Sequence, residues 1–148
     1  ASVQENGCAA LDDLADSNEN NKVAVADAGG IPMILPAMNN LSSNANVQFQ
    51  GCSAFWNLAD NNENNKVIIA EAGGIPTILS AMRTHSSNAR VQEFGCGALW
   101  KLALNNGSNK VTISDAGGKA LIESAMRNYS SNAGVQEKGN GALCNLWK

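Results

Sequence analysis

Few residues in this chain are able to act as a nucleophile, a base or a metal ligand. Its 148 residues include one histidine and four cysteines. His85 alone does not make a histidine-rich zinc site, and no C-x-x-C pair is present. A catalytic Cys–His pair would need His85 to meet a thiol, whereas Cys8, Cys52 and Cys96 recur at a slot expected to be buried. The sequence therefore predicts no catalytic residue, no metal site, no cofactor and no enzymatic activity.

Tryptophan and asparagine, by contrast, have the chemistry of molecular recognition. An exposed indole gives rigid apolar contact area with a polar tip. An asparagine amide offers both a donor and acceptors to an extended peptide backbone. Trp56 stands directly before Asn57, and Trp100 stands before Lys101. Asn145 occupies the slot of Asn57 in a later copy of the same motif. These residues indicate a binding protein, and a sequence repeat positions them.

One segment of 14 residues occurs four times in the chain. The copies begin at residues 3, 47, 91 and 135 and read VQENGCAALDDLAD, VQFQGCSAFWNLAD, VQEFGCGALWKLAL and VQEKGNGALCNLWK. The period is 44 residues, and residues 47–90 and 91–134 are identical at 26 of 44 positions. A fixed period of this length predicts a stack of units that share one elongated core. We expect a single domain, 1–148, with a lone helix at 1–16 and repeats at 17–60, 61–104 and 105–148.

Three helices are predicted in each period. In the second unit they are expected at residues 65–72, 75–83 and 90–104. Asn64 or Asn65 is the expected N-cap of the first helix, and Gly73 ends that helix because glycine readily adopts the left-handed conformation. Pro76 suits the first turn of the second helix, where a missing N–H costs nothing. The third helix is the longest, and the polar link before it is expected to supply its cap.

Two units depart from this pattern. Lys119 and Ala120 replace the Ile-Pro pair in the third unit, where a helix is still able to start. Pro36 lies one turn inside the second helix of the first unit. We expect Pro36 to bend or loosen that turn, because proline removes a backbone donor.

The third helix has two different faces on a helical wheel. One face is the predicted core stripe, which in the second copy consists of Val47, Gly51, Ala54, Phe55 and Leu58. The opposite face carries Phe49, Ser53, Trp56 and Asp60, with Asn57 on its shoulder. Trp56 and Trp100 are therefore expected to point away from the core on adjacent third helices, which we call rungs of the stack. The slot three residues before the tryptophan slot holds a small residue in every copy, and we expect these small residues to leave the floor of a groove open: Ala9, Ser53, Gly97 and Gly141.

The whole unit resembles an armadillo repeat. A short helix, a Gly-Gly-Ile-Pro turn, a second helix and a long third helix ending in A-x-W-N-L-A are similar to that family over essentially the whole chain. The resemblance implies an all-α, right-handed α-solenoid whose third helices line a concave groove. It also implies that this groove binds an extended peptide or a disordered segment of a partner protein. The slot of the family's asparagine ladder matches Asn57 and Asn145, with Asp13 and Lys101 in the other two copies.

The predicted peptide-binding site combines the aromatic and amide slots. It consists of Trp56, Asn57, Trp100, Lys101 and Asn145, with Phe49 and Asp13 as flanking contacts. Two alternatives stay open: the tryptophans serve only packing between third helices, or the asparagines only hydrogen-bond the adjacent third helix.

Charges on this face are uneven. The first rung carries Glu5, Asp12, Asp13 and Asp16, and the last two rungs carry Lys101, Lys138 and Lys148. We expect such a gradient to orient a bound peptide.

Composition excludes several classes of protein. A net charge of −3 argues against duplex nucleic-acid binding, and no apolar run approaches the ~20 residues of a membrane span. Neighbouring helices lie ~8–10 Å apart, whereas a disulfide needs Cα atoms within about 7 Å. The cysteines at the repeated slot are therefore expected to be free thiols. Free thiols indicate a reducing compartment, the cytoplasm or the nucleus.

The ends of the repeat array suggest a second function. Trp147 stands where the earlier copies have alanine, and a bulky apolar residue there is suited to contact another copy of the chain. The alternative to a peptide-binding scaffold is therefore a fragment or engineered module of a longer array. Such a module would form homo-oligomers through its uncapped ends, with Trp147 as the self-association residue.

Overall fold

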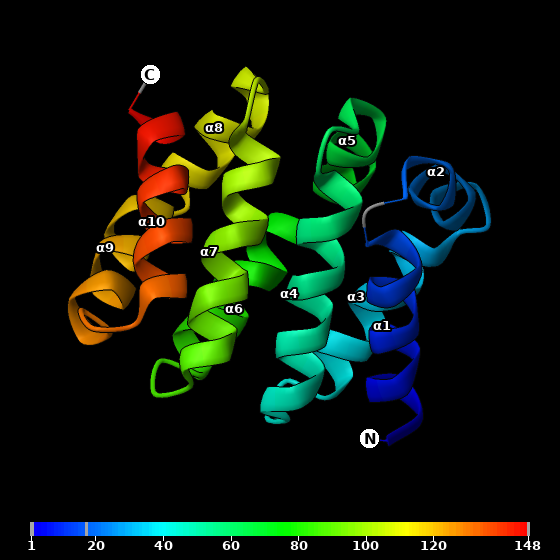
Figure 1. The fold of residues 1–148 in the computed structure, drawn as a ribbon, viewed down its shortest axis with the longest axis horizontal. Coiled ribbons are helices and arrows are strands. Elements are labelled where there is room, and N and C mark those ends of the chain that lie inside the picture. The colour runs from blue at the N-terminus through cyan, green and yellow to red at the C-terminus, as the bar shows by residue number, and fades with distance from the viewer. Residues whose placement is uncertain (1, 17, 148) are drawn as a thin grey trace.

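The computed structural model describes residues 2–16 and 18–147. Within these residues the chain is all-α, as predicted, and no helix is long and apolar enough to cross a membrane. The helices are α1 (Ser2–Ala15), α2 (Glu19–Asp27), α3 (Gly30–Asn40), α4 (Ala45–Ala59), α5 (Glu63–Glu71), α6 (Gly74–Thr84), α7 (Ala89–Ala103), α8 (Gly107–Asp115), α9 (Gly118–Asn128) and α10 (Ala133–Leu146). They form an α-solenoid in which α1 precedes three units of three helices. Figure 1 shows the third helices α1, α4, α7 and α10 side by side.

Asparagine caps the first helix of every unit. Asn18, Asn62 and Asn106 have extended backbones, and each side-chain oxygen accepts from the backbone N–H three residues later. The predicted cap at Asn64 or Asn65 is wrong, because α5 begins directly after Asn62. Asn65 has a different role, since its buried side chain bonds to the preceding unit. In a run of asparagines, the cap is the one whose amide is not needed in the core.

A left-handed glycine separates the first and second helices. The φ angles of Gly29, Gly73 and Gly117 are 75°, 91° and 79°, which confirms the predicted role of Gly73. The second helices α3, α6 and α9 each have 11 residues. α9 starts without the Ile-Pro pair, as expected. α3 continues through Pro36 to the same length, so the expected loosening does not shorten this helix.

Each second helix is held against its third helix by a glutamine and a glycine. The Gln92 amide donates to the carbonyls of Met82 and His85 at 2.8 and 3.0 Å, which satisfies the last turn of α6. Gly95 lies so close to Met82 that a Cβ added to the glycine would stand 2.5 Å from Met82 Cγ. The other two units repeat both contacts, through Gln48 and Gly51 and through Gln136 and Gly139.

Buried polar side chains join helices within one unit and between consecutive units. The Asn65 amide donates to the carbonyls of Lys22, in the preceding unit, and Leu58 at 3.2 and 3.0 Å. Lys66 is only 1% exposed, and its ammonium donates to the Leu104 carbonyl at 2.7 Å. Leu104 is the C-cap of α7, so the lysine satisfies the end of the third helix of its own unit. The Asn65 bonds therefore join two consecutive units, and the Lys66 bond joins the first and third helices of one unit.

The core runs between the third helices and the shorter helices. The predicted core stripe of α4 is buried throughout: Val47, Gly51, Ala54, Phe55 and Leu58. The opposite face is more covered than predicted, because Ser53 is buried and Trp56 is half-buried. The reason is that α4 packs side by side with α1 and α7, which cover its flanks.

The cysteines at the repeated slot are buried free thiols, as predicted. Burial raises the pKa of Cys52 and of Cys96 to about 12. Thiolate is the reactive form of cysteine, so these two thiols have little nucleophilic character near neutral pH. They act as small apolar residues of the core.

Matched substitutions at the glycine slot of the third helix test this packing. Gly95→Ala is expected to lower the free energy of unfolding by about 1–3 kcal/mol, because Met82 and α6 must shift. Gly7, in the same slot of α1, has no atom within 4 Å of an added Cβ. Gly7→Ala is expected to raise the free energy of unfolding by about 0.5–1 kcal/mol through helix propensity. Urea unfolding followed by circular dichroism measures both, and equal effects at the two positions would contradict this packing.

Candidate functional site

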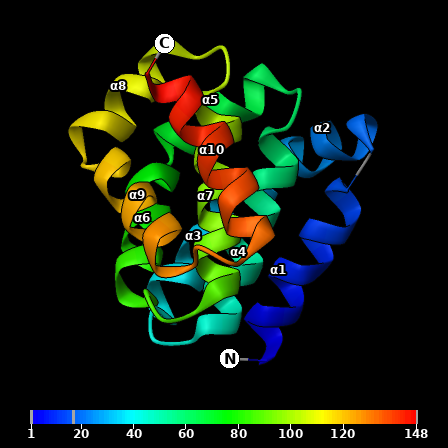
Figure 2. The ribbon, with the colours of Figure 1, turned by 60° about the vertical axis from the view of Figure 1, so that its left-hand side comes forward.

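The residues predicted to bind a partner lie on one surface, which we call the third-helix face. It is formed by α1, α4, α7 and α10 on the side opposite the core stripe. Each of these helices packs against the next, and the two views agree on their side-by-side order (Figures 1 and 2). Its predicted members are Asp13 on α1, Phe49, Trp56 and Asn57 on α4, Trp100 and Lys101 on α7, and Asn145 on α10.

Trp56 rests on the backbone of the next rung. Its nearest indole carbons would lie 3.4 Å from a Cβ added at Gly97, which is an ordinary contact distance. Phe94 meets the indole edge-on, with ring centroids 5.6 Å apart. Trp56 Nε1 is buried and has no hydrogen-bond partner among the described residues. The ring is therefore held by packing, and its N–H contributes no bond that would fix it.

Lys138 reaches from α10 across α7 to the same ring. Its ammonium lies 4.9 Å from the Trp56 ring centroid and 5.1 Å from that of Phe94. The ammonium also pairs with Glu93 at 2.8 Å. The stem of the lysine passes over Gly97, where an added Cβ would stand 2.9 Å from Lys138 Cδ. The missing side chain at Gly97 thus allows three consecutive third helices to meet at one point.

Trp100 is seated in the same way one rung further along. Its ring lies over Gly141 of α10, where an added Cβ would stand 2.5 Å from the indole Cδ2. The Lys101 ammonium lies 4.7 Å from the Trp100 ring centroid and pairs with Asp60 at 2.7 Å. Two of the small slots, Gly97 and Gly141, therefore receive the tryptophan of the preceding third helix. At these two slots the expected open groove floor is wrong, because an indole ring lies over the glycine.

The two asparagines make different bonds. Asn57 donates to the Asp12 carboxylate of α1 at 2.7 Å, so it bonds to the adjacent rung. Asn145 donates to the Gly141 carbonyl of its own helix at 2.8 Å. One bond uses only part of an amide, which has two donor hydrogens and an acceptor oxygen. Both side chains are half-buried, and both retain hydrogen-bonding capacity for a partner.

The two flanking residues lie in different surroundings. Phe49 belongs to an aromatic cluster, since its ring lies edge-on to Phe94 at 5.0 Å and the Arg90 guanidinium lies 4.3 Å from its centroid. Asp13 is exposed on the first rung. The structure thus brings Phe49 close to Trp56 through Phe94, whereas Asp13 stands apart from that cluster.

Sequence reasoning did not identify four residues of this cluster as site residues: Arg90, Glu93, Phe94 and Lys138. Phe94 and Lys138 share the slot of Gln50, which the helical wheel places on the shoulder of the outward face. Contact from this slot to the preceding rung depends on how closely the third helices approach, and that distance is not visible in the sequence. The change from glutamine to an aromatic residue and then to lysine in this slot was the available signal.

Ion pairs neutralise the predicted basic end of the face. Lys101 pairs with Asp60, and Lys138 pairs with Glu93. Lys148 lies outside the described residues. Among the described residues, the expected orientation of a peptide by charge therefore rests on the acidic residues of α1.

Trp147 lies outside this surface, at the C-cap of α10. Its side chain is 68% exposed, and the Lys119 ammonium of α9 lies 4.2 Å from its ring centroid. The position is compatible with a contact to another molecule. Self-association through Trp147 stays a prediction.

The histidine is a structural contact between links. A ring nitrogen of His85 lies 2.7 Å from the Ser42 carbonyl of the preceding unit, and Tyr129 makes the same kind of bond to the Ser86 carbonyl. Over the described residues, no group of three His, Cys, Asp or Glu side chains is placed to hold a metal ion.

Comparison with known proteins identifies the family. The model of the LRRK2 ARM repeat matches residues 1–148. The chain belongs to this armadillo-repeat family. A search of curated proteins finds no match to the armadillo chain. The match confirms, over residues 1–148, the armadillo family that the repeated motif predicts.

Two solved structures resemble this armadillo chain, and both are crystal structures of engineered proteins from the Northeast Structural Genomics Consortium. Each is 26% identical to it, with TM-scores of 0.84 and 0.85. The first alignment covers 97% of this chain and 56% of the engineered protein, and the second covers 99% and 34%. The chain therefore spans about half and about a third of the lengths of these proteins.

The carboxyl group of Asp12 gives a pH-dependent test of the rung-to-rung contacts. Burial raises its pKa, and bonds from Ser53 and Asn57 offset this only in part. A raised folded-state pKa means that stability is lost as the pH rises and Asp12 ionises. In this armadillo chain Asp12→Asn is therefore expected to raise the free energy of unfolding at pH 7. The gain should shrink as the pH falls below about 4, where the carboxyl is protonated in both states.

Urea unfolding midpoints at neutral and acidic pH measure this effect. Asp13→Asn, at the exposed neighbouring residue, is the matched control and is expected to show a smaller gain, because Asp13 acts on the Asp12 carboxyl only through its charge. A gain for Asp12→Asn that is independent of pH, or a loss at neutral pH, would contradict the assignment.

Proposed function

We propose that this armadillo chain is a non-catalytic protein-interaction scaffold that binds an extended segment of a partner protein along the third-helix face. The repeat fold is typical of interaction scaffolds. The observation that carries the proposal is that Trp56 and Trp100, each partly exposed, lie on glycines of the next third helix. Tryptophans held in fixed positions on a surface are the residues that most often dominate binding energy.

An extended segment suits the spacing of this surface. The same slots recur once per rung along α1, α4, α7 and α10, so a partner must cross several helices to use them. A strand-like backbone presents donors and acceptors along its length, which the amides of Asn57 and Asn145 are able to bond. Apolar side chains of the partner would contact the exposed parts of the indole rings.

The rigidity of the face favours binding. Gly97, Phe94 and Lys138 lie against Trp56 before any partner arrives. Ordering a side chain at an interface costs about 0.5–1.5 kcal/mol, and a ring that is already held avoids most of this cost. We propose a reducing compartment, the cytoplasm or the nucleus, because the cysteines at the repeated slot are free thiols.

A peptide-display screen tests the proposed surface. The wild-type chain is expected to enrich peptides with apolar residues, and the Trp56→Ala, Trp100→Ala double variant is expected to lose them. A loss of about 2 kcal/mol per tryptophan hot spot corresponds to about a thirtyfold weaker affinity for each. Trp147→Ala is the matched control, because this tryptophan is exposed and lies outside the face.

Circular dichroism checks that the double variant is folded. Asn145→Ala, which removes a half-buried amide with little packing, is a second variant and is expected to weaken the selected peptides more modestly. Identical enrichment by the wild type and the folded tryptophan variant would refute the proposed site.

End-to-end self-association is the competing function. Trp147 is the exposed apolar residue that would carry it. Sedimentation velocity over a range of concentrations separates the two functions, because the scaffold proposal predicts a monomer. Oligomers that grow with concentration and disappear in Trp147→Asp would favour the competing function instead.

A further inference from the structure

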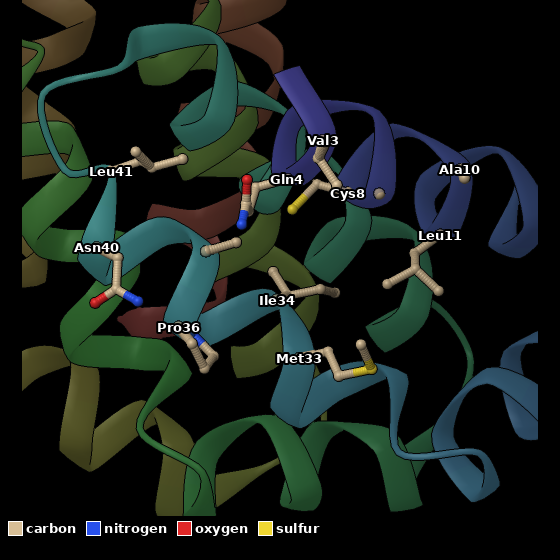
Figure 3. A pocket seen from close by; sticks show the side chains of 12 residues that line it. Val3, Gln4, Cys8, Ala10, Leu11, Met33, Ile34, Pro36, Asn40 and Leu41 are labelled. Carbon is tan, nitrogen blue, oxygen red and sulfur yellow. The ribbon is translucent and has the colours of Figure 1, made fainter. Parts of the chain in front are cut away.

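A groove of about 660 Å³ lies between α1 and α3, apart from the third-helix face. It is lined on one side by Val3, Gln4, Gly7 and Leu11 of α1, and on the other by residues of α3 that include Met33. Figure 3 shows these side chains of α1 and α3 projecting into the space between the two helices. The lining is mainly apolar, so the groove exposes a surface that resembles a core.

The exposed side of α1 carries the same residue types that are buried in the other third helices. Val3 is 78% exposed, whereas Val47, Val91 and Val135, in the same slot of the other third helices, are fully buried. Leu14 is 50% exposed, and its counterpart Leu58 is fully buried. In α4, α7 and α10 this side packs against the second helix of the same unit. Among the described residues no helix covers it in α1.

The glycine of this side is open in α1 and filled elsewhere. A Cβ added at Gly7 would meet no atom within 4 Å. At Gly51, Gly95 and Gly139 it would collide with the methionine of a second helix. We call the hollow at this glycine the cradle. A methionine fills the cradle in α4, α7 and α10, and the cradle of α1 is empty.

A second feature of the filled copies concerns their glutamine. Gln48, Gln92 and Gln136 each donate to two carbonyls in the last turn of a second helix, at 2.8 to 3.1 Å. One carbonyl belongs to the methionine, and the other belongs to the C-cap residue three positions later. Gln4 occupies this slot in α1, is exposed, and lines the groove.

The facing side of α3 is uncovered as well. Met33 is 71% exposed, whereas Thr77, in the same slot of α6, is 9% exposed because α6 packs beside α3. A smaller cavity of about 380 Å³, lined by Leu11, Leu14 and Met33, adjoins this region. Both walls of the groove therefore have the shape and composition that a neighbouring second helix covers elsewhere in the stack.

We propose that the groove between α1 and α3 binds an amphipathic α-helix of a partner protein. The occupant carries a methionine that lies over Gly7, and an aliphatic residue one turn earlier, as Ile122 and Met126 both lie against Gly139. It ends three residues after the methionine, where the Gln4 amide bonds to its last carbonyls. This surface is separate from the third-helix face, so the proposal does not depend on extended-peptide binding.

A helix copied from this chain is the probe. The peptide has the sequence of residues 74–88, GIPTILSAMRTHSSN, with a fluorescein label. Glu and Lys at positions 80 and 84, exposed in α6, form a lactam that holds the peptide helical. Fluorescence anisotropy during titration with the 148-residue chain is expected to rise to saturation. The same peptide with Met82→Asp is expected not to bind, because its charge would be buried over Gly7.

Substitutions of residues that line the groove test whether the peptide binds there. Gly7→Leu places a side chain in the cradle at a position where an added Cβ meets no atom within 4 Å, and it is expected to weaken binding of the peptide at least about tenfold. Gly107→Leu is the matched control, because a Cβ there also meets no atom within 4 Å, and it is expected to bind like the wild type. Gln4→Ala removes the amide donor and is expected to weaken the peptide about three- to tenfold. Circular dichroism confirms that each variant is folded.

Three results would overturn the proposal. The first is no rise in anisotropy with the wild-type chain. The second is equal affinity for the wild type and Gly7→Leu, which would mean that the peptide exchanges with an internal helix. The third is a dimer in sedimentation that Gly7→Leu converts to a monomer, which would assign the groove to a second copy of the chain.

Discussion

The close approach that glycine permits is the constraint on which this structure depends. The third helices α4 and α7 each have a second helix against one side and another third helix along each flank. Gly95 admits the Met82 side chain from the second helix, and Gly97, two residues later, admits the Trp56 ring and the Lys138 stem from neighbouring rungs. A larger residue at either position would force the Met82 or Lys138 side chain to move, because protein interiors have little spare volume. The third-helix face consists of the side-chain surface that these contacts leave uncovered.

Buried polar side chains hold the helices of one unit together and join that unit to the preceding one. A buried ammonium is tolerated only when it has partners, and Lys66 finds one at the end of the following third helix. Asn65 connects the carbonyls of Lys22 and Leu58 in the same region. These bonds involve neither Trp56 nor Trp100, so the residue in the tryptophan slot is able to vary without loss of these bonds. The first and last copies carry Asp12 and Cys144 in that slot.

The periodicity of the sequence predicted the helices, the core stripe and the family, because each depends on local chemistry that recurs every 44 residues. The start of α5 was missed because several adjacent asparagines are able to cap a helix, and only burial decides among them. The seat of Trp56 was missed because Lys138 reaches it across an intervening helix. The open cradle at Gly7 was also missed, since its residues match those of the filled copies. Only the positions of the helices show which copy lacks its occupant.

The central claim is that the third-helix face, with its two seated tryptophans, is the surface that binds a partner segment. The chain has three tryptophans, so NMR of their indole N–H groups reports on each separately during titration with a peptide from the display screen. The account predicts that the signals of Trp56 and Trp100 shift with the peptide while that of Trp147 stays unchanged. A shift confined to Trp147, or a bound peptide that leaves the signals of Trp56 and Trp100 unmoved, would contradict it.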